Sequence, residues 1–111
     1  FVRTLIDIAK ADPNVELITG DLGFGVLKPY WEQLPDQFIN AGIAEQNMTS
    51  VAAGMALEGK TVFTYSIGNF PTLRCLEQKL PHPRHRQTPM HIRLTLNRSA
   101  MTALIRRQMS R

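Results

Sequence analysis

The stretch Ala41-Gly-Ile-Ala-Glu-Gln-Asn-Met48 decides the fold of this chain. It places one carboxylate, Glu45, between a short apolar strand predicted at 37–40 and a helix of apolar periodicity that is predicted to end near Gly59. A carboxylate at such a turn lies near the positive end of the helix and at the rim of a sheet, where open α/β sheets hold ligands. The position suits a working acid, although Glu is also common in the first turn of helices that have no function.

Helical and extended patterns alternate on both sides of this stretch. The sequence predicts a helix at 2–9, a strand at 15–19, a glycine-rich turn at 20–25, a short helix at 27–34, a strand at 61–65 and, after a turn at 68–71, a further helix. The alternation predicts an α/β fold in which a parallel sheet of at least three strands is covered by helices.

The length of 111 residues bounds the chain to one small domain. The lone cysteine, Cys75, excludes an internal disulfide and suits a reducing, cytoplasmic compartment. Its apolar neighbours in the sequence predict a buried and inert thiol. No segment resembles a signal peptide or a membrane span.

The net charge of +4 conceals two unlike parts. Residues 1–78 carry nine acidic and five basic side chains, whereas residues 79–111 carry Lys79, seven arginines and no acid. All three histidines lie in the second part, and all glycines, aromatics and valines lie in the first. We therefore expect a folded region at 1–78 and a basic tail at 79–111.

The stretch Gly42-Ile-Ala-Glu-Gln-Asn-Met48, followed by the small-residue run at 52–59, resembles the pyrimidine-binding domain of transketolases and of the related deoxyxylulose-phosphate synthases. The resemblance also covers the segments 1–10, 15–22, 61–66 and 70–78. It implies an incomplete thiamine-diphosphate-binding fold over residues 1–78. The function implied is the pyrimidine-binding part of an enzyme that transfers ketol groups between sugar phosphates.

Glu45 aligns with the glutamate that, in the resembled family, hydrogen-bonds a ring nitrogen of the aminopyrimidine of thiamine diphosphate. That bond promotes the imino tautomer, whose nitrogen takes the proton from the thiazolium carbon, and the cofactor then acts as an electron sink. Because the carboxyl must donate a proton, it needs a partly apolar site that favours its neutral form. Its position between Ile43 and Met48 is consistent with such a site.

Four further residues take possible roles from the same resemblance. Phe70 would stack on the aminopyrimidine, or else be a core residue after a turn. Tyr65 would line the same pocket, or only pack at the end of its strand. Arg74 would face a substrate phosphate, unless it is an exposed helix charge. Asp21 matches an acid near the cofactor, although an aspartate in a turn needs no such role.

The diphosphate and its magnesium ion (Mg2+) are expected on a partner chain. The resembled family binds them through a Gly-Asp-Gly motif and a later Asn on a separate domain, whereas Gly20-Asp-Leu22 lacks the second glycine. Gln46 and Asn47 are expected at the interface with that partner subunit, in a homo- or hetero-oligomer. The histidines have no carboxylate or thiolate companions nearby in the sequence, so no metal site is expected on this chain. We expect the chain to lack turnover by itself.

The tail at 79–111 does not resemble the family. Segment 80–89 resembles a linker or a disordered stretch, 92–96 is predicted as an orphan strand, and Ser99 is predicted to cap a last helix with an apolar stripe through Met109. An out-of-frame translation produces a joint loss of glycine, valine, aromatics and acids. We therefore expect that the tail arises from a frameshift and that the family's domain is truncated after about residue 78.

Two other interpretations stay open. The chain could be a fragment of a deoxyxylulose-phosphate synthase or of the β-subunit of a 2-oxo-acid dehydrogenase, although Asn47-Met48 and Asn69-Phe-Pro71 favour the split kind of transketolase. Alternatively, it is a non-enzymatic module whose basic tail binds nucleic acid in a salt-sensitive manner. The tail lacks the interleaved aromatics of single-strand binders, which weighs against nucleic acid.

Overall fold

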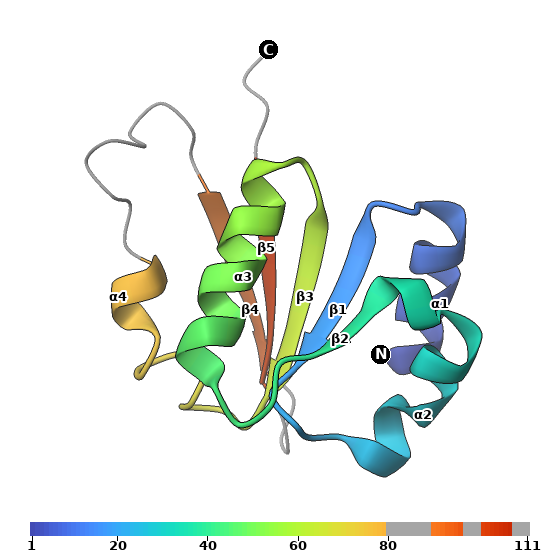
Figure 1. Cartoon of the computed structure of the whole chain (residues 1–111), viewed down its shortest axis with the longest axis horizontal. Coiled ribbons are helices and arrows are strands. Elements are labelled where there is room, and N and C mark those ends of the chain that lie inside the picture. The colour runs from blue at the N-terminus through green and yellow to red at the C-terminus, as the bar shows by residue number, and fades with distance from the viewer. Residues whose placement is uncertain (80–89, 97–100, 108–111) are drawn as a thin grey trace.

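The computed structural model describes residues 1–79, 90–96 and 101–107, and it has alternating helices and strands (Figure 1). In chain order the elements are α1 (Val2–Ala11), β1 (Val15–Thr19), α2 (Phe24–Gln33), the 3-10 turn η1 (Pro35–Gln37), β2 (Phe38–Asn40), α3 (Glu45–Leu57), β3 (Thr61–Ser66), α4 (Leu76–Lys79), β4 (Met90–Leu96) and β5 (Met101–Arg107).

One five-stranded sheet organises these elements, with the strand order β2-β1-β3-β5-β4. Strands β2, β1 and β3 are parallel, and Leu17 of β1 is in register with Phe38 on one side and Phe63 on the other. Strand β5 runs antiparallel to both β3 and β4. The predicted parallel sheet is therefore confirmed for three strands, and the antiparallel pair makes the sheet as a whole mixed.

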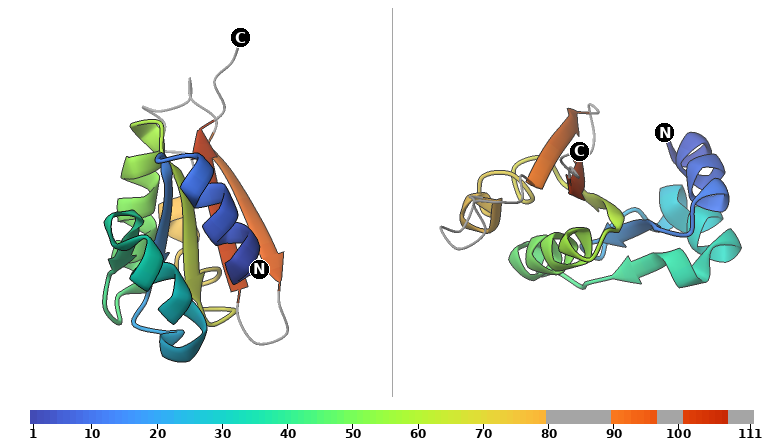
Figure 2. Two further views of the ribbon diagram at one scale, coloured as in Figure 1. Left: turned by 90° about the vertical axis from the view of Figure 1, so that its right-hand side faces the viewer. Right: turned by 90° about the horizontal axis from the view of Figure 1, so that it is seen from above.

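Different helices pack on the two faces of the parallel strands. Val15 and Leu17 of β1 pack with the apolar sides of α1 and α2, whereas Ile18 of β1 and Val62 of β3 pack with α3. Figure 2 shows α1 and α3 on opposite faces of the strands. The alternation of side chains along a strand explains this division, since neighbouring residues point to opposite faces.

Glycines at two turns set where the helices begin and end. Gly23 precedes α2 with a φ of 79°, and a Cβ there would lie 2.8 Å from Leu27 and 2.9 Å from Tyr65, so only glycine fits without a shift. Gly59 follows α3 with a φ of 95°, in the left-handed region where helices commonly end. The end of α3 near Gly59 was predicted from the sequence and is confirmed.

Two local predictions are corrected. After the turn at 68–71 the chain continues as a turn through Cys75, and only Leu76–Lys79 is helical. The predicted last helix is wrong, because residues 101–107 form the strand β5 along the edge of β3, with Val62 in register with Ile105. The orphan strand predicted at 92–96 lies within β4, which pairs with β5. Ser99, Met109 and the segment 80–89 lie outside the described residues.

Within the described part of the chain, no helix is both long enough and apolar enough to cross a bilayer.

Candidate functional site

The carboxyl ends of β1, β2 and β3 lie at one edge of the sheet, and α3 begins at this edge. The chain passes from β1 to β2 on one side and then crosses β1 to reach β3 on the other, so the strand order reverses between β1 and β3. Open α/β sheets bind ligands at such a reversal. Glu45 lies there: a Cβ on Gly20, directly after β1, would be 3.7 Å from Glu45 Cγ and 3.6 Å from Ser66 Oγ at the end of β3.

Glu45 is the first residue of α3 and is only 8% exposed. The buried hydroxyl of Ser66 donates a long hydrogen bond of 3.4 Å to Glu45 Oε1. Among residues 1–78, no basic side chain forms an ion pair with this carboxylate. The amino terminus of α3 supplies positive potential near Glu45, because the first backbone N–H groups of a helix have no partner within the helix.

The apolar surroundings that the sequence predicted for Glu45 are present on one side only. Met48, one turn along α3, is fully buried. Ile43 is 83% exposed, so it does not cover the carboxylate. Thr49 Oγ1 donates a 2.8 Å bond to the backbone carbonyl of Glu45 and anchors the first turn of the helix.

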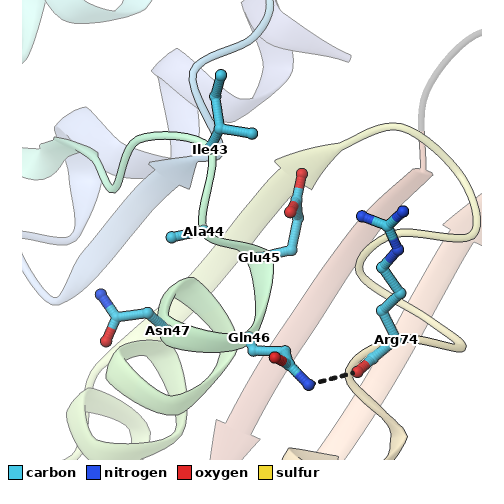
Figure 3. Close-up of a pocket in the computed structure, with 6 residues that line it drawn as sticks. All are labelled: Ile43, Ala44, Glu45, Gln46, Asn47 and Arg74. Carbon is cyan, nitrogen blue, oxygen red and sulfur yellow. Dashed lines mark hydrogen bonds between the residues drawn. The ribbon is translucent and has the colours of Figure 1, made fainter.

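A hollow of about 520 Å³ opens beside Glu45. Its lining residues are Ile43, Ala44, Glu45, Gln46, Asn47 and Arg74. Figure 3 shows the carboxylate of Glu45 and the guanidinium of Arg74 projecting on the same side, while the amide of Gln46 turns to the carbonyl of Arg74 at 3.1 Å. The hollow is therefore lined by a carboxylate and a guanidinium that do not form an ion pair with each other.

Phe70 and Arg74, which the sequence assigned to separate roles, lie against each other. The Arg74 Cζ atom lies 4.4 Å from the centroid of the Phe70 ring, a cation–π arrangement. Cys75 is buried, as predicted, and its Sγ donates to the carbonyl of Phe70 at 3.2 Å. The segment from Phe70 to Cys75 is thus folded on itself and tied to α3 through Gln46.

Asp21 lies in the loop after β1 and has a φ of 58°, in the left-handed region that few residues other than glycine adopt. Its Oδ1 accepts a 2.9 Å bond from Nδ2 of Asn40, the last residue of β2. Asn40 Oδ1 in turn accepts from the backbone N–H of Asp21 at 3.1 Å and from that of Gly42 at 3.0 Å. One carboxamide therefore connects the loop after β1 to the turn that leads into α3.

Tyr65 is not brought to the face of the sheet that carries Glu45. Its ring packs against the cluster formed with α1 and α2, close to Gly23. Its backbone carbonyl accepts from the N–H of Gly20 at 3.2 Å and from Thr19 Oγ1 at 3.3 Å. The geometry agrees with the packing alternative that the sequence left open for this residue.

Sequence reasoning missed two polar residues of the site, Asn40 and Ser66. Each is the last residue of a parallel strand, at the edge of the sheet where α3 begins. Polar side chains at successive strand ends were the available signal, since those ends share one edge in a parallel sheet. Among the described residues, no group of three or more His, Cys, Asp or Glu could hold a metal ion.

A family model described as "Transketolase, pyrimidine binding domain" matches residues 1–102. The chain is 38% identical over 79 residues to one subunit of the apulose-4-phosphate transketolase of Phocaeicola vulgatus, and the match covers 70% of this chain and 25% of that protein. It is 40% identical over 78 residues to the putative transketolase C-terminal section of Methanocaldococcus jannaschii, covering 69% and 25%. It is also 47% identical over 60 residues to a 1-deoxy-D-xylulose-5-phosphate synthase of Synechococcus sp., covering 53% and 9%.

A solved structure titled "Split gene transketolase, inactive beta4 tetramer" is similar in fold. The TM-score is 0.60 at 30% sequence identity, and the match covers 68% of this chain and 26% of that one. The chain spans about a quarter of the length of the transketolase relatives it matches.

Proposed function

Because the chain belongs to the transketolase pyrimidine-binding-domain family, we propose that it supplies the pyrimidine half of a thiamine diphosphate site shared between two chains. The reaction proposed for the assembled enzyme is ketol transfer between sugar phosphates in the cytoplasm. This chain alone is proposed to lack turnover.

One observation carries the proposal: Glu45 is buried at the strand-order reversal, beside a hollow, without an ion-pair partner among residues 1–78. A carboxyl in that position fits the pyrimidine end of the cofactor, because it can exchange a proton with a ring nitrogen. The buried hydroxyl of Ser66 bonds Oε1. The other carboxyl oxygen is then available to the ligand.

When bound, thiamine diphosphate supplies an electron sink at its thiazolium carbon. Glu45 would hold the pyrimidine ring by a hydrogen bond from its carboxyl to a ring nitrogen. Phe70 offers a ring for stacking, and Arg74 offers a guanidinium to a substrate phosphate. Asp21 lies at the same edge of the sheet, and Tyr65 supports the loop after β1 from the opposite face.

The partner is proposed to be a chain that carries the diphosphate-binding domain and its Mg2+. Two relatives are named as a subunit and as a C-terminal section, which is consistent with an enzyme divided between chains. The exposed side chains of Ile43 and Asn47 border the hollow and would face that partner.

Hydrogen exchange at the thiazolium carbon tests the role of Glu45. The complex with a diphosphate-binding transketolase subunit is loaded with thiamine diphosphate and Mg2+, and loss of the carbon-bound proton is followed by NMR in D2O. Glu45→Ala is expected to slow exchange by about 10²-fold or more, the contribution typical of a positioned acid or base. The matched control is Glu58→Ala, which removes an exposed carboxylate at the other end of α3.

Unchanged exchange in the Glu45→Ala complex would remove this residue from the mechanism. A ketol transfer catalysed by the isolated chain with cofactor and Mg2+ would overturn the shared-site part of the proposal.

A second candidate activity is that of 1-deoxy-D-xylulose-5-phosphate synthase. It is favoured by the 47% identity to the Synechococcus protein, although that match is shorter than those to the transketolase relatives. Product analysis of the reconstituted complex distinguishes the two, since only one of them forms 1-deoxy-D-xylulose 5-phosphate.

A further inference from the structure

The side chain of Asn40 makes more hydrogen bonds than a strand-end residue on the surface requires. Its amide nitrogen donates to Asp21 Oδ1 at 2.9 Å, and its amide oxygen accepts from two backbone N–H groups, those of Asp21 and Gly42, at 3.1 and 3.0 Å. Asparagine is suited to this arrangement because one end of its carboxamide donates and the other end accepts. The orientation of the amide follows from these three partners.

These bonds fix the chain that leads to Glu45. Ala41 N donates to Thr19 O at 2.8 Å, which prolongs the β1–β2 pairing, and Ala44 N donates to Gly42 O at 2.8 Å. Between these two bonds, the N–H of Gly42 is held by Asn40 Oδ1. The turn before α3 is thus restrained at three of its residues, Ala41, Gly42 and Ala44.

The same carboxamide stabilises the unusual backbone of Asp21. A φ of 58° is costly for a residue with a side chain, and it persists where surrounding contacts hold it. Here the N–H and the carboxylate of Asp21 both bind Asn40. The carboxylate therefore has a structural partner within the chain.

We propose that Asn40 and Asp21 form a clasp that positions Glu45, with Asp21 acting through Asn40 and not through contact with the cofactor. The clasp itself stands on the three hydrogen bonds, and only its effect on the pyrimidine rests on the proposed function. Asn40 is a positioning residue, because it touches the turn before Glu45 and not the carboxyl itself.

Exchanging the two side chains tests the proposal. In the double variant Asp21→Asn/Asn40→Asp, the new carboxylate at 40 can accept from both backbone N–H groups and from the new amide at 21, so all three bonds are retained. Asn40→Asp alone places two carboxylates against each other and loses the amide donor. Asp21→Asn alone keeps an acceptor for Asn40 while removing the charge.

The first measurement needs no cofactor. Amide hydrogen exchange by NMR on the full chain is expected to show at least about fivefold faster exchange at Gly42 in Asn40→Ala, because the N–H of Gly42 loses its acceptor, a hydrogen bond of ordinary strength. Asn40→Asp keeps that acceptor, and faster exchange is expected there because the carboxylates at 21 and 40 repel each other and displace it. Ile18 on β1, which lies between β2 and β3, serves as the reference amide, and its exchange is expected to stay unchanged. The double variant is expected to restore the wild-type rate at Gly42. Unchanged exchange at Gly42 in Asn40→Ala would overturn the clasp.

The second measurement is thiazolium hydrogen exchange in the reconstituted complex. Asn40→Asp is expected to slow it about tenfold, because displacement of a catalytic group by a fraction of an ångström is costly. Asp21→Asn is expected to be near wild type, and the double variant is expected to recover. If Asp21→Asn alone is slow and fails to rescue Asn40→Asp, the charge of Asp21 acts directly and the proposal is wrong.

The control Asp36→Asn, which removes an exposed carboxylate from η1, is expected to change neither measurement. Failure of the proposed function has a different signature. In that case Glu45→Ala leaves thiazolium exchange unchanged, while the amide exchange cycle at Gly42 still reports the clasp.

Discussion

Glu45 is buried beside a hydroxyl and a helix terminus, and it forms no ion pair among residues 1–78. Ser66 donates to Oε1, and Oε2 makes no hydrogen bond among the described residues. A hydroxyl that bonds one carboxyl oxygen leaves the second oxygen without a partner among the described residues, and that oxygen is open to a ligand.

Tyr30 is the residue whose ionisation the fold affects most clearly. Its side chain is fully buried between α1, α2 and the sheet, and its hydroxyl has no hydrogen-bond partner in the part of the chain that the structure describes. Burial, and then the negative charge of Glu16, raise the pKa of Tyr30 from 10.0 to about 12. The folded state thus holds the phenol proton more tightly than the unfolded chain does.

We predict that Tyr30→Phe stabilises the protein by about 1 kcal/mol near neutral pH, because it removes an unpaired buried hydroxyl and keeps the ring. In the wild type, the Tyr30 contribution is constant below pH 10, and the free energy of unfolding falls as the pH rises from 10 toward 12. The Phe variant lacks this decrease. Urea denaturation at several pH values between 7 and 11 measures both effects.

Tyr65→Phe is the matched control, since it removes the hydroxyl of the partly exposed tyrosine. A Tyr30→Phe variant that is less stable than the wild type at neutral pH would show that the hydroxyl has a partner after all.

The sequence singles out Glu45 because the residues around it form a specific motif, and the structure places it beside the hollow; its role stays a prediction. The sequence was not sufficient to find Ser66, which is 21 positions away and reaches Glu45 only because β3 lies next to β1. Asn40 was missed for a related reason. A polar residue at a strand end has the same appearance in sequence whether it is solvated or connects two loops.

Helix α3 is the element that joins the site to the core. Its small residues Ala52 and Ala56 are buried against Ile18 and Val62 of the sheet, whereas Gly54 is exposed on the other side of the helix. Ala52 and Ala56 thus let α3 lie close to the chain's own sheet. Gly54 is open to solvent in the isolated chain.

Two substitutions on α3 are predicted to change the free energy of unfolding in opposite directions. Gly54→Ala is expected to stabilise the protein by about 0.5–1 kcal/mol, because a Cβ there meets nothing within 4 Å and alanine favours the helix. Ala52→Leu is expected to destabilise it by about 1–3 kcal/mol through overpacking against the sheet. Urea midpoints of the two variants measure these changes. A destabilised Gly54→Ala protein would contradict the placement of this residue on the exposed side.

Local patterns predicted the elements from α1 to β3, because each of them carries its own periodicity. The strand β5 was missed because the stripe through Met101, Leu104 and Ile105 also fits helical spacing. What selects the strand is a partner distant in the sequence, since Leu104 and Ile105 are in register with Phe63 and Val62 on the open side of β3. Pairing of this kind satisfies backbone groups that a sheet edge would leave unpaired, and no local pattern records it.

The part of this chain that matches its transketolase relatives amounts to about a quarter of their length. Residues 1–78 carry several exposed apolar side chains. Ile43 is the most exposed large apolar residue among residues 1–78, and it borders the hollow beside Glu45. An isoleucine that is 83% exposed beside the hollow is a position where a contact with a second chain can be tested.

We predict that Ile43→Arg lowers the affinity for a diphosphate-binding partner chain at least about tenfold, because a charge would be buried at a contact centre. The stability of the free chain is expected to be unchanged. Ile8→Arg on α1 provides the matched control, since Ile8 is also exposed but does not line the hollow. Sedimentation velocity of the mixed chains measures the affinity, and equal losses in both variants would argue against a contact at Ile43.

The stacking of Arg74 on Phe70 has a consequence for the order in which ligands bind. A planar ligand that uses this face of the ring must compete with the guanidinium already lying 4.4 Å from its centroid. An anion that draws Arg74 away removes the competitor, at a saving of the order of 0.5–1 kcal/mol for an exposed cation–π contact. Occupation by an anion and occupation by an aromatic ring would then favour each other, which would give a small positive cooperativity between two ligand types within a single loop.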